Sequence, residues 1–171
     1  MKIRIQAGYT PGIIGKIAEL HATYYHQHWG LDLFFEAKVA TELSDFLMNF
    51  DASRDGFWYG TAGNQIAGSI AIVGSRNEER EGRLRWLIVA PAFQHRGLGE
   101  SLIAHAVRFC GQLSYRRIYL TTFAGLDQAR HLYEKTGFRL CREQPDNHWG
   151  KTVVEQEFEF VIEDHPSITV R

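Results

Sequence analysis

The sequence predicts an α/β fold: a mixed, mostly antiparallel central sheet of about seven strands with helices on both faces. Two patterns predict it: short segments in which apolar and polar residues alternate, and longer segments in which apolar residues recur at three- and four-residue spacing. The second kind repeatedly interrupts the first, which is typical of a sheet covered by helices. Because the chain has 171 residues and 44% of them are hydrophobic, we expect residues 1–171 to form a single domain.

The N-terminal part of the chain predicts one strand and the first of two helices. Isoleucines alternate with polar residues at 3–5, which indicates a short strand. Thr10 is expected to cap a helix over about 10–26, and Pro11 suits its first turn. Gly30 then interrupts the helical pattern.

The next segments predict the second helix and a run of antiparallel strands. Apolar residues repeat at helical spacing over 31–50. The segments 57–61 and 65–73 have the pattern of two strands joined by a tight glycine-asparagine turn. Residues 74–82 are charged and polar, so we expect them to form the next hairpin loop.

The C-terminal half predicts a helix between two strands, followed by two more strands. Strands are expected at 83–90 and 116–122, with a helix over 97–111 between them. The last two strands are expected at 138–142 and 153–161. The residues that follow are expected to form a loose tail.

A glycine-rich loop directly follows the expected strand 83–90. Gly97 and Gly99 allow a positive φ or a close approach of the backbone to a ligand. The helix over 97–111 begins at this loop, so its unpaired N–H groups and the positive end of its dipole would face an anion such as a pyrophosphate. On spacing alone, an ordinary strand-to-helix turn is the alternative.

Two motifs resemble those of the GNAT superfamily of N-acetyltransferases. The run 94–99, Gln-His-Arg-Gly-Leu-Gly, is similar to that family's acyl-CoA loop, Gln/Arg-x-x-Gly-x-Gly/Ala. The run 129–138 is similar to its Ala-x-x-Leu-Tyr-x-x-x-Gly-Phe helix, which Asp127 is expected to cap. The order of the expected elements also matches the family along nearly the whole chain. Walker and dinucleotide loops do not fit this sequence context.

The resemblance implies that acetyl-CoA is the donor substrate. Its pantetheine arm would pair with the main chain near Ile88 and Val89, and its diphosphate would bind N–H groups of the loop, with Arg96 adding charge at the rim. Tyr133 would be the general acid for the departing thiolate, unless it merely packs within its helix. The residues that would contact the coenzyme are Leu87, Ile88, Val89, Gln94, His95, Arg96, Gly97, Leu98, Gly99, Glu100, Ala129, Leu132 and Tyr133.

The expected general base departs from the family pattern. Several members carry a glutamate eleven positions before the loop glutamine, where this chain has Arg83. Arg83 and Arg85 would share one face of the strand, repelling a cationic amine and attracting an acidic group. A carboxylate-bearing acceptor is therefore one candidate. Ordered water, or Glu81 acting through water, would then serve as the base.

The acceptor pocket is expected between the first two helices and the last hairpin. Aromatic and imidazole side chains cluster near the break between the helices, either as part of this pocket or as ordinary packing. His148 is a candidate base, or an exposed loop residue. His21, His26 and His28 lack the four-residue spacing of paired ligands on a helix, so no metal is expected. The residues expected to bind the acceptor are Trp29, Arg83, Arg85, His148 and Trp149.

The composition argues against nucleic-acid binding and membrane contact as functions of this chain. Nineteen basic and twenty acidic residues give a net charge of −1, which argues against a nucleic-acid-binding surface. There is no signal-like segment and no apolar run of about eighteen residues, so we expect a cytoplasmic protein without membrane contact. Cys110 and Cys141 are expected to be reduced thiols. A homodimer is common for the implied fold, but no interface is readable.

A narrower resemblance concerns the acetyltransferase modules that follow winged-helix (MarR-type) regulator domains in some bacterial proteins. The segments 84–86, 94–99, 129–133, 149–150 and 155–156 contribute to it. Because no DNA-reading segment precedes the first strand, we expect a free-standing bacterial relative. The predicted activity is acetyl transfer to a primary amine of a small molecule or protein by direct attack in a ternary complex. A non-catalytic acyl-CoA sensor of the same fold is the alternative.

Overall fold

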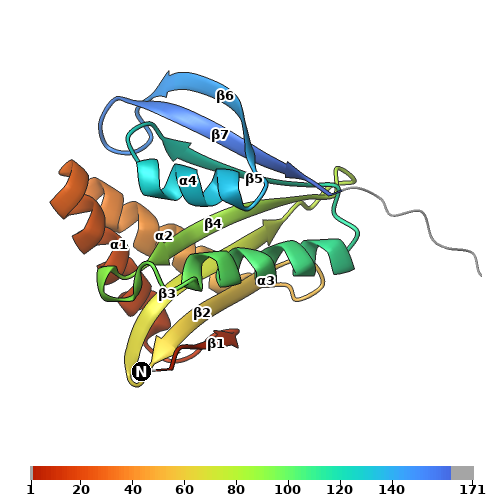
Figure 1. The fold of residues 1–171 in the computed structure, drawn as a ribbon, viewed down its shortest axis with the longest axis horizontal. Coiled ribbons are helices and arrows are strands. Elements are labelled where there is room, and N and C mark those ends of the chain that lie inside the picture. Colours follow the sequence, from red (N-terminus) through yellow and green to blue (C-terminus); the bar gives the residue numbers. More distant parts are fainter. Residues whose placement is uncertain (1, 163–171) are drawn as a thin grey trace, which may run out of the picture.

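The computed structural model describes residues 2–162, which form a seven-stranded sheet flanked by four α-helices (Figure 1). The strand order is β1-β2-β3-β4-β5-β7-β6, and within these residues only the β4–β5 pair is parallel. The predicted fold class is confirmed, whereas the tail expected at 163–171 lies outside the described residues. The elements are β1 (Arg4–Ala7), α1 (Ile13–Trp29), α2 (Leu33–Met48), β2 (Gly56–Ala62), β3 (Gln65–Gly74), β4 (Glu81–Val89), the 3₁₀ turn η1 (Pro91–Phe93), α3 (Leu98–Gln112), β5 (Arg117–Phe123), α4 (Asp127–Lys135), β6 (Arg139–Asp146) and β7 (Val153–Val161).

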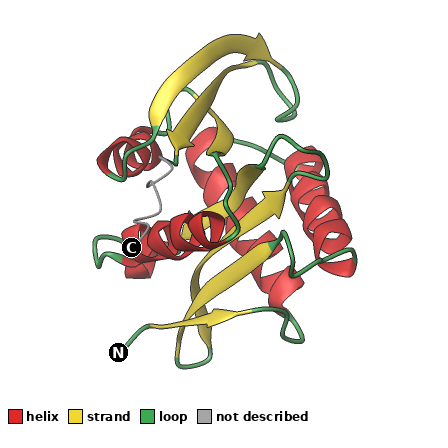
Figure 2. Cartoon of the chain, turned by 90° about the vertical axis from the view of Figure 1, so that its right-hand side faces the viewer, coloured by secondary structure: helices red, strands yellow, loops and turns green. Residues whose placement is uncertain are grey.

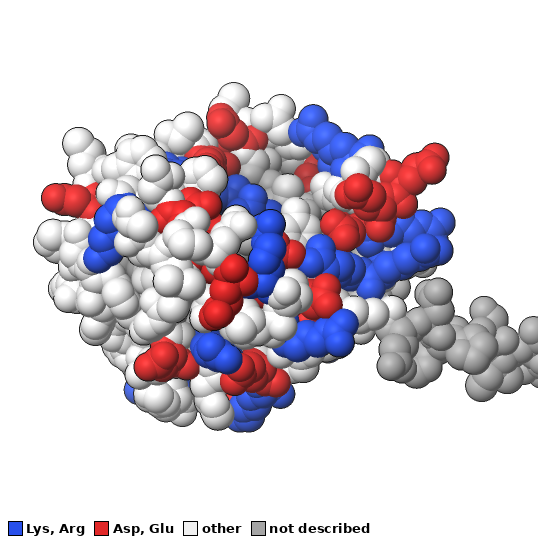
Figure 3. Space-filling view, turned by 90° about the horizontal axis from the view of Figure 1, so that it is seen from above, with Lys and Arg blue, Asp and Glu red and all other residues white. Residues whose placement is uncertain are grey.

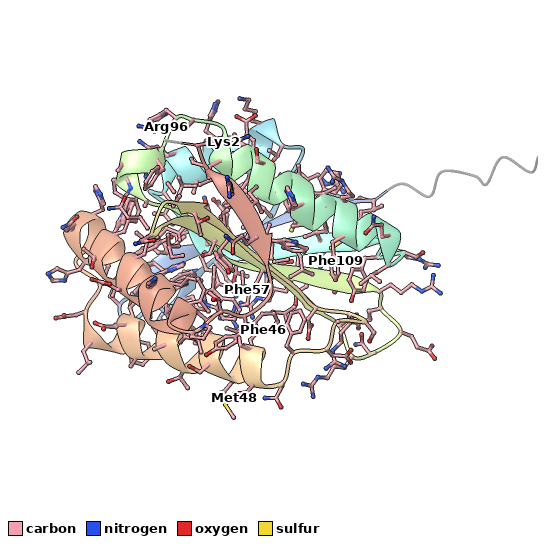
Figure 4. The ribbon with its side chains drawn as sticks, turned by 90° about the horizontal axis from the view of Figure 1, so that it is seen from below. Lys2, Phe46, Met48, Phe57, Arg96 and Phe109 are labelled. Atoms are coloured by element: carbon pink, nitrogen blue, oxygen red, sulfur yellow. The ribbon has the colours of Figure 1, made fainter. Side chains whose placement is uncertain are left out.

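The helices cover the two faces of the sheet in pairs, which divides the core into two layers (Figure 2). One layer lies under α3 and α4 and contains the fully buried Leu102. The other lies under α1 and α2 and contains the fully buried Ile17. Figure 4 shows Phe46 of α2 near Phe57 of β2 in this second layer, and their ring centroids are 6.5 Å apart. Each layer buries the apolar stripe of its helices, which is the main source of stability in such a fold.

β4 carries a β-bulge at Trp86, where the register with β3 shifts by one residue. Trp86 has a φ of 49°, and its carbonyl accepts a 2.7 Å hydrogen bond from the Ser69 hydroxyl. A bulge re-aims the side chains that follow it. As a result, the consecutive residues Arg85 and Trp86 both contact α2, the first through Glu42 and the second through Phe46.

β4 and β5 pair over only three residues and then separate. Their ladder ends at the pair formed by Arg83 and Tyr119. Beyond it, β4 continues along β3 up to Val89, and β5 continues along β7 up to Phe123. In Figure 1 the two strands diverge toward the end of the sheet where α3 begins. The edge of β4 that faces β5 is therefore left without a strand partner over its last residues.

Two predicted helix caps are wrong. α1 begins after Gly12, which has a φ of 86° and provides no side-chain cap, so Thr10 contributes only a carbonyl that accepts a 3.1 Å bond from the Ile13 N–H. α4 has Leu126 at its N-cap position, and Asp127 is its first helical residue rather than its cap. The interruption predicted at Gly30 is confirmed, because Gly30 adopts a left-handed conformation and ends α1. The helix itself runs to Trp29, three residues beyond its predicted end at residue 26.

Acidic and basic side chains are interspersed on the surface. Figure 3 shows both signs mixed on the face seen from above. On β5, for example, Arg117 forms ion pairs with Glu81, Glu157 and Glu159 at 3.2, 2.6 and 2.7 Å. None of the helices in residues 2–162 is both long and apolar enough to traverse a lipid bilayer.

A buried histidine in α1 is expected to make the protein less stable at acid pH. His21 is only 5% exposed, and burial lowers its pKa to about 4. In the unfolded chain the ordinary pKa is about 6.5. Because only the unfolded state takes up this proton between these values, the contribution of His21 to the free energy of unfolding should fall by about 3 kcal/mol from pH 6.5 to pH 4.

Urea denaturation at several pH values measures this contribution. His21→Gln should reduce the fall in the free energy of unfolding between pH 6.5 and pH 4. His105→Gln is the matched control. His105 makes the same bond as His21, from Nδ1 to the carbonyl four residues earlier at 2.8 Å, but on an exposed helix face. Equal changes of the pH dependence in both variants would contradict the assignment to burial.

Candidate active site

Two cavities meet near the separation of β4 and β5. The larger has a volume of about 920 Å³ and is lined by the end of β4, the loop that follows, the start of α3, α4 and the end of α1. The smaller has a volume of about 340 Å³ and is lined by α1, α2, β4, β5 and the β6–β7 hairpin. Tyr25, Leu87 and Tyr133 line both. The two cavities therefore share a boundary formed by these three residues.

The larger cavity contains the N-terminus of α3. Gly97 is the N-cap with a φ of 75°, and no side chain caps the helix. His95 also has a positive φ, 59°, which shapes the turn before the helix. The first N–H groups of a helix have no intrahelical acceptor, and they carry the positive end of its dipole. The geometry therefore suits an anionic group of a ligand.

Gly99 allows α3 to pack closely against α4. A Cβ at this position would lie 2.7 Å from Leu132 Cδ2, so the Leu132 side chain would have to move. Across the same junction, Glu100 and Lys135 form a 2.6 Å ion pair. Gln94 fixes the other end of the loop, because its Nε2 donates to the Val89 carbonyl at 3.2 Å.

The structure places nearly all of the residues expected to contact the coenzyme around the larger cavity. Those in its lining are Leu87, Ile88, Val89, Gln94, His95, Gly97, Leu98, Gly99, Glu100, Ala129, Leu132 and Tyr133. Arg96 is not part of the lining: it is exposed, and its guanidinium lies 5.7 Å from the centre of the Phe93 ring. Figure 4 shows Arg96 at the outer edge of the molecule.

Tyr133 stands where the two cavities meet. Its side chain is 7% exposed, and its ring packs against Phe138 and Phe158 at centroid distances of 6.1 and 5.7 Å. Burial raises the pKa of the Tyr133 hydroxyl, so it stays protonated at neutral pH. Within residues 2–162 this hydroxyl has no hydrogen-bond partner, which leaves it available to a ligand as a donor.

The smaller cavity contains four of the five residues expected to bind the acceptor. Arg83, Arg85, His148 and Trp149 line it, but Trp29 lines the larger cavity. The pocket is built by the first two helices and the last hairpin, as expected. Tyr25, from the aromatic cluster near the helix break, also lines it, whereas no role was predicted for the lining residues Glu42, Thr121 and Glu155.

The two arginines of β4 are not equivalent, which corrects the expectation that both attract an acidic group. Arg85 forms an ion pair with Glu42, which also binds Lys38. These cations lower the pKa of Glu42 against the opposing effect of its burial. Arg83 instead donates from Nη2 to the Thr121 hydroxyl at 3.0 Å. Within residues 2–162, Arg83 has no salt-bridge partner, and neither has Glu155, which accepts a 3.4 Å bond from Trp149 Nε1.

His148 lies at the hairpin side of the smaller cavity. Its Nδ1 is 2.9 Å from Asp146 Oδ1, which also accepts the His148 N–H at 2.7 Å. This contact leaves Nε2 as the free ring nitrogen. Glu155 lies close by, and the three residues could hold a metal because their candidate ligand atoms lie within 4.8 Å of one another.

The histidines of α1 serve other roles. His21 and His26 bond through Nδ1 to the carbonyls of Ile17 and Leu31, at 2.8 and 3.1 Å. Both cysteines are free, as predicted: Cys110 is buried in the core, which raises its pKa to about 12, and Cys141 is exposed on β6.

Several solved structures share the fold of this chain. An acetyltransferase of the GNAT family from Staphylococcus aureus Mu50 matches with a TM-score of 0.78 and 18% identity, covering 95% of this chain and 100% of that one. The yncA protein of Salmonella typhimurium, solved with its cofactor acetyl-CoA, has a TM-score of 0.74, 12% identity and 96% coverage of both chains. At these identities the likeness is one of fold.

A third match is spermidine N-acetyltransferase from Vibrio cholerae, solved in complex with CoA and spermine. It has a TM-score of 0.70 and 19% identity, with 93% of this chain and 95% of that chain covered. No curated protein sequence shows significant similarity to the chain. The family model described as "Acetyltransferase (GNAT) family" matches residues 16–138, which include β4, the glycine loop and Tyr133. The chain therefore belongs to the GNAT acetyltransferase family.

Proposed function

We propose that this protein is an acetyl-CoA-dependent N-acetyltransferase that acts on a primary amine by direct attack in a ternary complex. The observation that carries the proposal is the meeting of two cavities at Tyr133, one suited to the coenzyme and the other to an acceptor. A protein that only sensed acyl-CoA would need the first cavity but not the second.

Acetyl-CoA fits the larger cavity in two respects. The uncapped N-terminus of α3 can bind the diphosphate through the N–H groups that follow Gly97. The unpaired edge of β4 around Leu87 to Val89 can bind the pantetheine arm by main-chain hydrogen bonds, as an added strand would. When bound, the coenzyme supplies an acetyl group activated as a thioester.

The residues at the junction have the chemistry that acetyl transfer needs. N–H groups of the unpaired β4 edge can stabilise the negative charge that develops on the acyl oxygen. As the acceptor nitrogen bonds to the acetyl carbon and the carbon–sulfur bond breaks, His148 takes the amine proton and Tyr133 gives its proton to sulfur. Asp146 orients the His148 ring for this role.

Thiol release tests the proposal. The purified chain is mixed with acetyl-CoA and a panel of primary amines, free thiol is followed with a colour reagent, and the acetylated product is identified by mass spectrometry. Release that depends on an acceptor supports the enzyme. Coenzyme binding without release for any acceptor would instead establish the sensor.

Replacing His148 with glutamine is expected to lower kcat about tenfold or more, because the amine then loses its general base. The loss should be smallest at alkaline pH, where the free amine needs no base. The rate is measured over pH 6 to 10, with His105→Gln as a control on an exposed helix face. An unchanged pH–rate profile in His148→Gln would remove His148 from the mechanism.

Two further parts of the proposal rest on the sequence. The first is kinship with the acetyltransferase modules that follow MarR-type regulator domains in some bacterial proteins. The second is a cytoplasmic location, which agrees with the two free cysteines.

A further inference from the structure

Arg83 lies in the smaller cavity without a counter-ion. Its Nε is buried and has no hydrogen-bond partner, and Nη2 donates only to the Thr121 hydroxyl. Within residues 2–162, no carboxylate lies within the 4.0 Å of a salt bridge to its guanidinium. Burial, reinforced by repulsion from Arg85, lowers the pKa of Arg83. The fold therefore holds a cation where an isolated charge is disfavoured.

The acidic groups of the cavity attract Arg83 from a distance but form no ion pair with it. Glu42 is engaged by both Arg85 and Lys38, so the three form one charge cluster on the α2 side. Glu155, the other carboxylate in the lining, lies beyond salt-bridge distance of Arg83. Lys38, Arg83 and Arg85 against Glu42 and Glu155 leave the lining with one excess positive charge, and Arg83 is the cation in it that has no ion-pair partner within residues 2–162.

The bond to Thr121 indicates where the guanidinium lies along the strands. Thr121 is two residues beyond Tyr119, the partner of Arg83 in the β4–β5 ladder. The side chain of Arg83 therefore reaches forward to about the level of Arg85, two residues before Leu87 at the junction of the cavities. At a rise of about 3.3 Å per residue, the guanidinium lies at most on the order of 7 Å from the junction, because the bulge at Trp86 shortens this part of the strand.

We propose that the acceptor is a primary amine that carries a carboxylate on the order of 7 Å from its nitrogen, and that Arg83 binds this carboxylate while the amine lies beside Tyr133. The inference rests on the proposed function, because it places the amine at the transfer site. A guanidinium binds a carboxylate through two parallel hydrogen bonds, which Lys38 could not reproduce. An α-amine adjacent to its carboxylate is too short for this span, whereas a chain of six carbons fits it.

A matched set of acceptors tests the proposal on the full chain. 6-Aminohexanoate has the carboxylate at the required distance, hexylamine replaces it with a methyl group, 1,6-diaminohexane replaces it with a cation, and glycine has it adjacent to the amine. We expect kcat/KM for 6-aminohexanoate to exceed that of the other three by about 10- to 100-fold, the range for a hydrogen-bonded ion pair.

Variants assign the preference to Arg83. Arg83→Met should lower kcat/KM for 6-aminohexanoate about 10- to 100-fold and leave that for hexylamine within about threefold. Arg83→Lys keeps the charge and should recover part of the loss, and it replaces the methionine variant if that protein does not fold. Arg108→Met, on an exposed position of α3, should change neither value.

Calorimetric binding of the same acceptors to the protein saturated with coenzyme A separates this inference from the proposed function. Turnover of hexylamine or the diamine as efficient as that of 6-aminohexanoate would overturn the inference and leave the acetyltransferase intact. Preferential binding of 6-aminohexanoate that Arg83→Met abolishes would support the inference even without turnover, and would then count against catalysis. Equal binding of all four acceptors would overturn the inference.

Discussion

Replacing Gly97 with glutamate is expected to abolish coenzyme A binding, raising Kd by at least about 10²-fold. The new carboxylate would stand at the N-terminus of α3, where it would satisfy the free N–H groups itself and repel the diphosphate. The protein should still fold, because a Cβ at Gly97 meets no heavy atom within 4 Å. The remaining cost is that of a positive φ, about 1 kcal/mol. Isothermal titration calorimetry with coenzyme A measures the effect.

Gly12→Glu is the matched control for this substitution. Gly12 is likewise an N-cap, at α1, with a φ of 86°, and a Cβ added there would meet no heavy atom within 4 Å. It is not part of the lining of the larger cavity. The two variants should lose similar stability, but only Gly97→Glu should lose coenzyme binding. If both bind as tightly as the wild type, the diphosphate site does not lie at the N-terminus of α3.

The coenzyme side of the site could be predicted because it is local in the sequence. The run 94–99 contains the end of the loop and the first residues of α3, so its glycine spacing already describes the anion site. Tyr133 lies on one short helix whose motif can be read without knowing what packs against it. In both cases the geometry depends on neighbours a few residues away, and backbone preferences determine it.

The lining of the smaller cavity could be predicted in large part, but its charge pairing could not, because that depends on contacts between distant segments. The alternation in β4 made Arg83 and Arg85 look equivalent, and only the packing of α2 on the sheet brings Glu42 to one of them. No local signal marks the bulge at Trp86, which is stabilised by Ser69 on the neighbouring strand. Tertiary contacts therefore determine which arginine of the smaller cavity is paired with a carboxylate.

The helical spacing of the aromatic residues around Tyr25 can be seen in the sequence, but its meaning is ambiguous. Tyr25 lies four residues from both His21 and Trp29, so the three share one face of α1. That spacing predicts an aromatic stripe, but it does not say whether the stripe packs in a core or lines a cavity. The structure shows both: Tyr25 packs on Phe35 at a centroid distance of 4.9 Å and lines the two cavities.

Tyr133→Phe is expected to lower kcat by about 10²-fold while leaving the Kd for coenzyme A nearly unchanged. The substitution removes only the proton donor, since the phenyl ring can keep its packing against Phe138 and Phe158. Because burial raises the pKa of the Tyr133 hydroxyl, the loss should be the same at every pH from 6 to 9. Steady-state kinetics with a saturating acceptor, combined with calorimetry, measure the two quantities.

Tyr25→Phe is the control, because Tyr25 is the other phenol at the junction of the cavities. Burial, together with the neighbouring Tyr133, raises the pKa of Tyr25 as well, so both hydroxyls are protonated under assay conditions. Protonation therefore cannot distinguish them, and only their position can. If Tyr133→Phe keeps the wild-type kcat and Tyr25→Phe loses it, the proton reaches sulfur from α1. A loss confined to Tyr133→Phe assigns the donor to α4, at the junction of the two cavities.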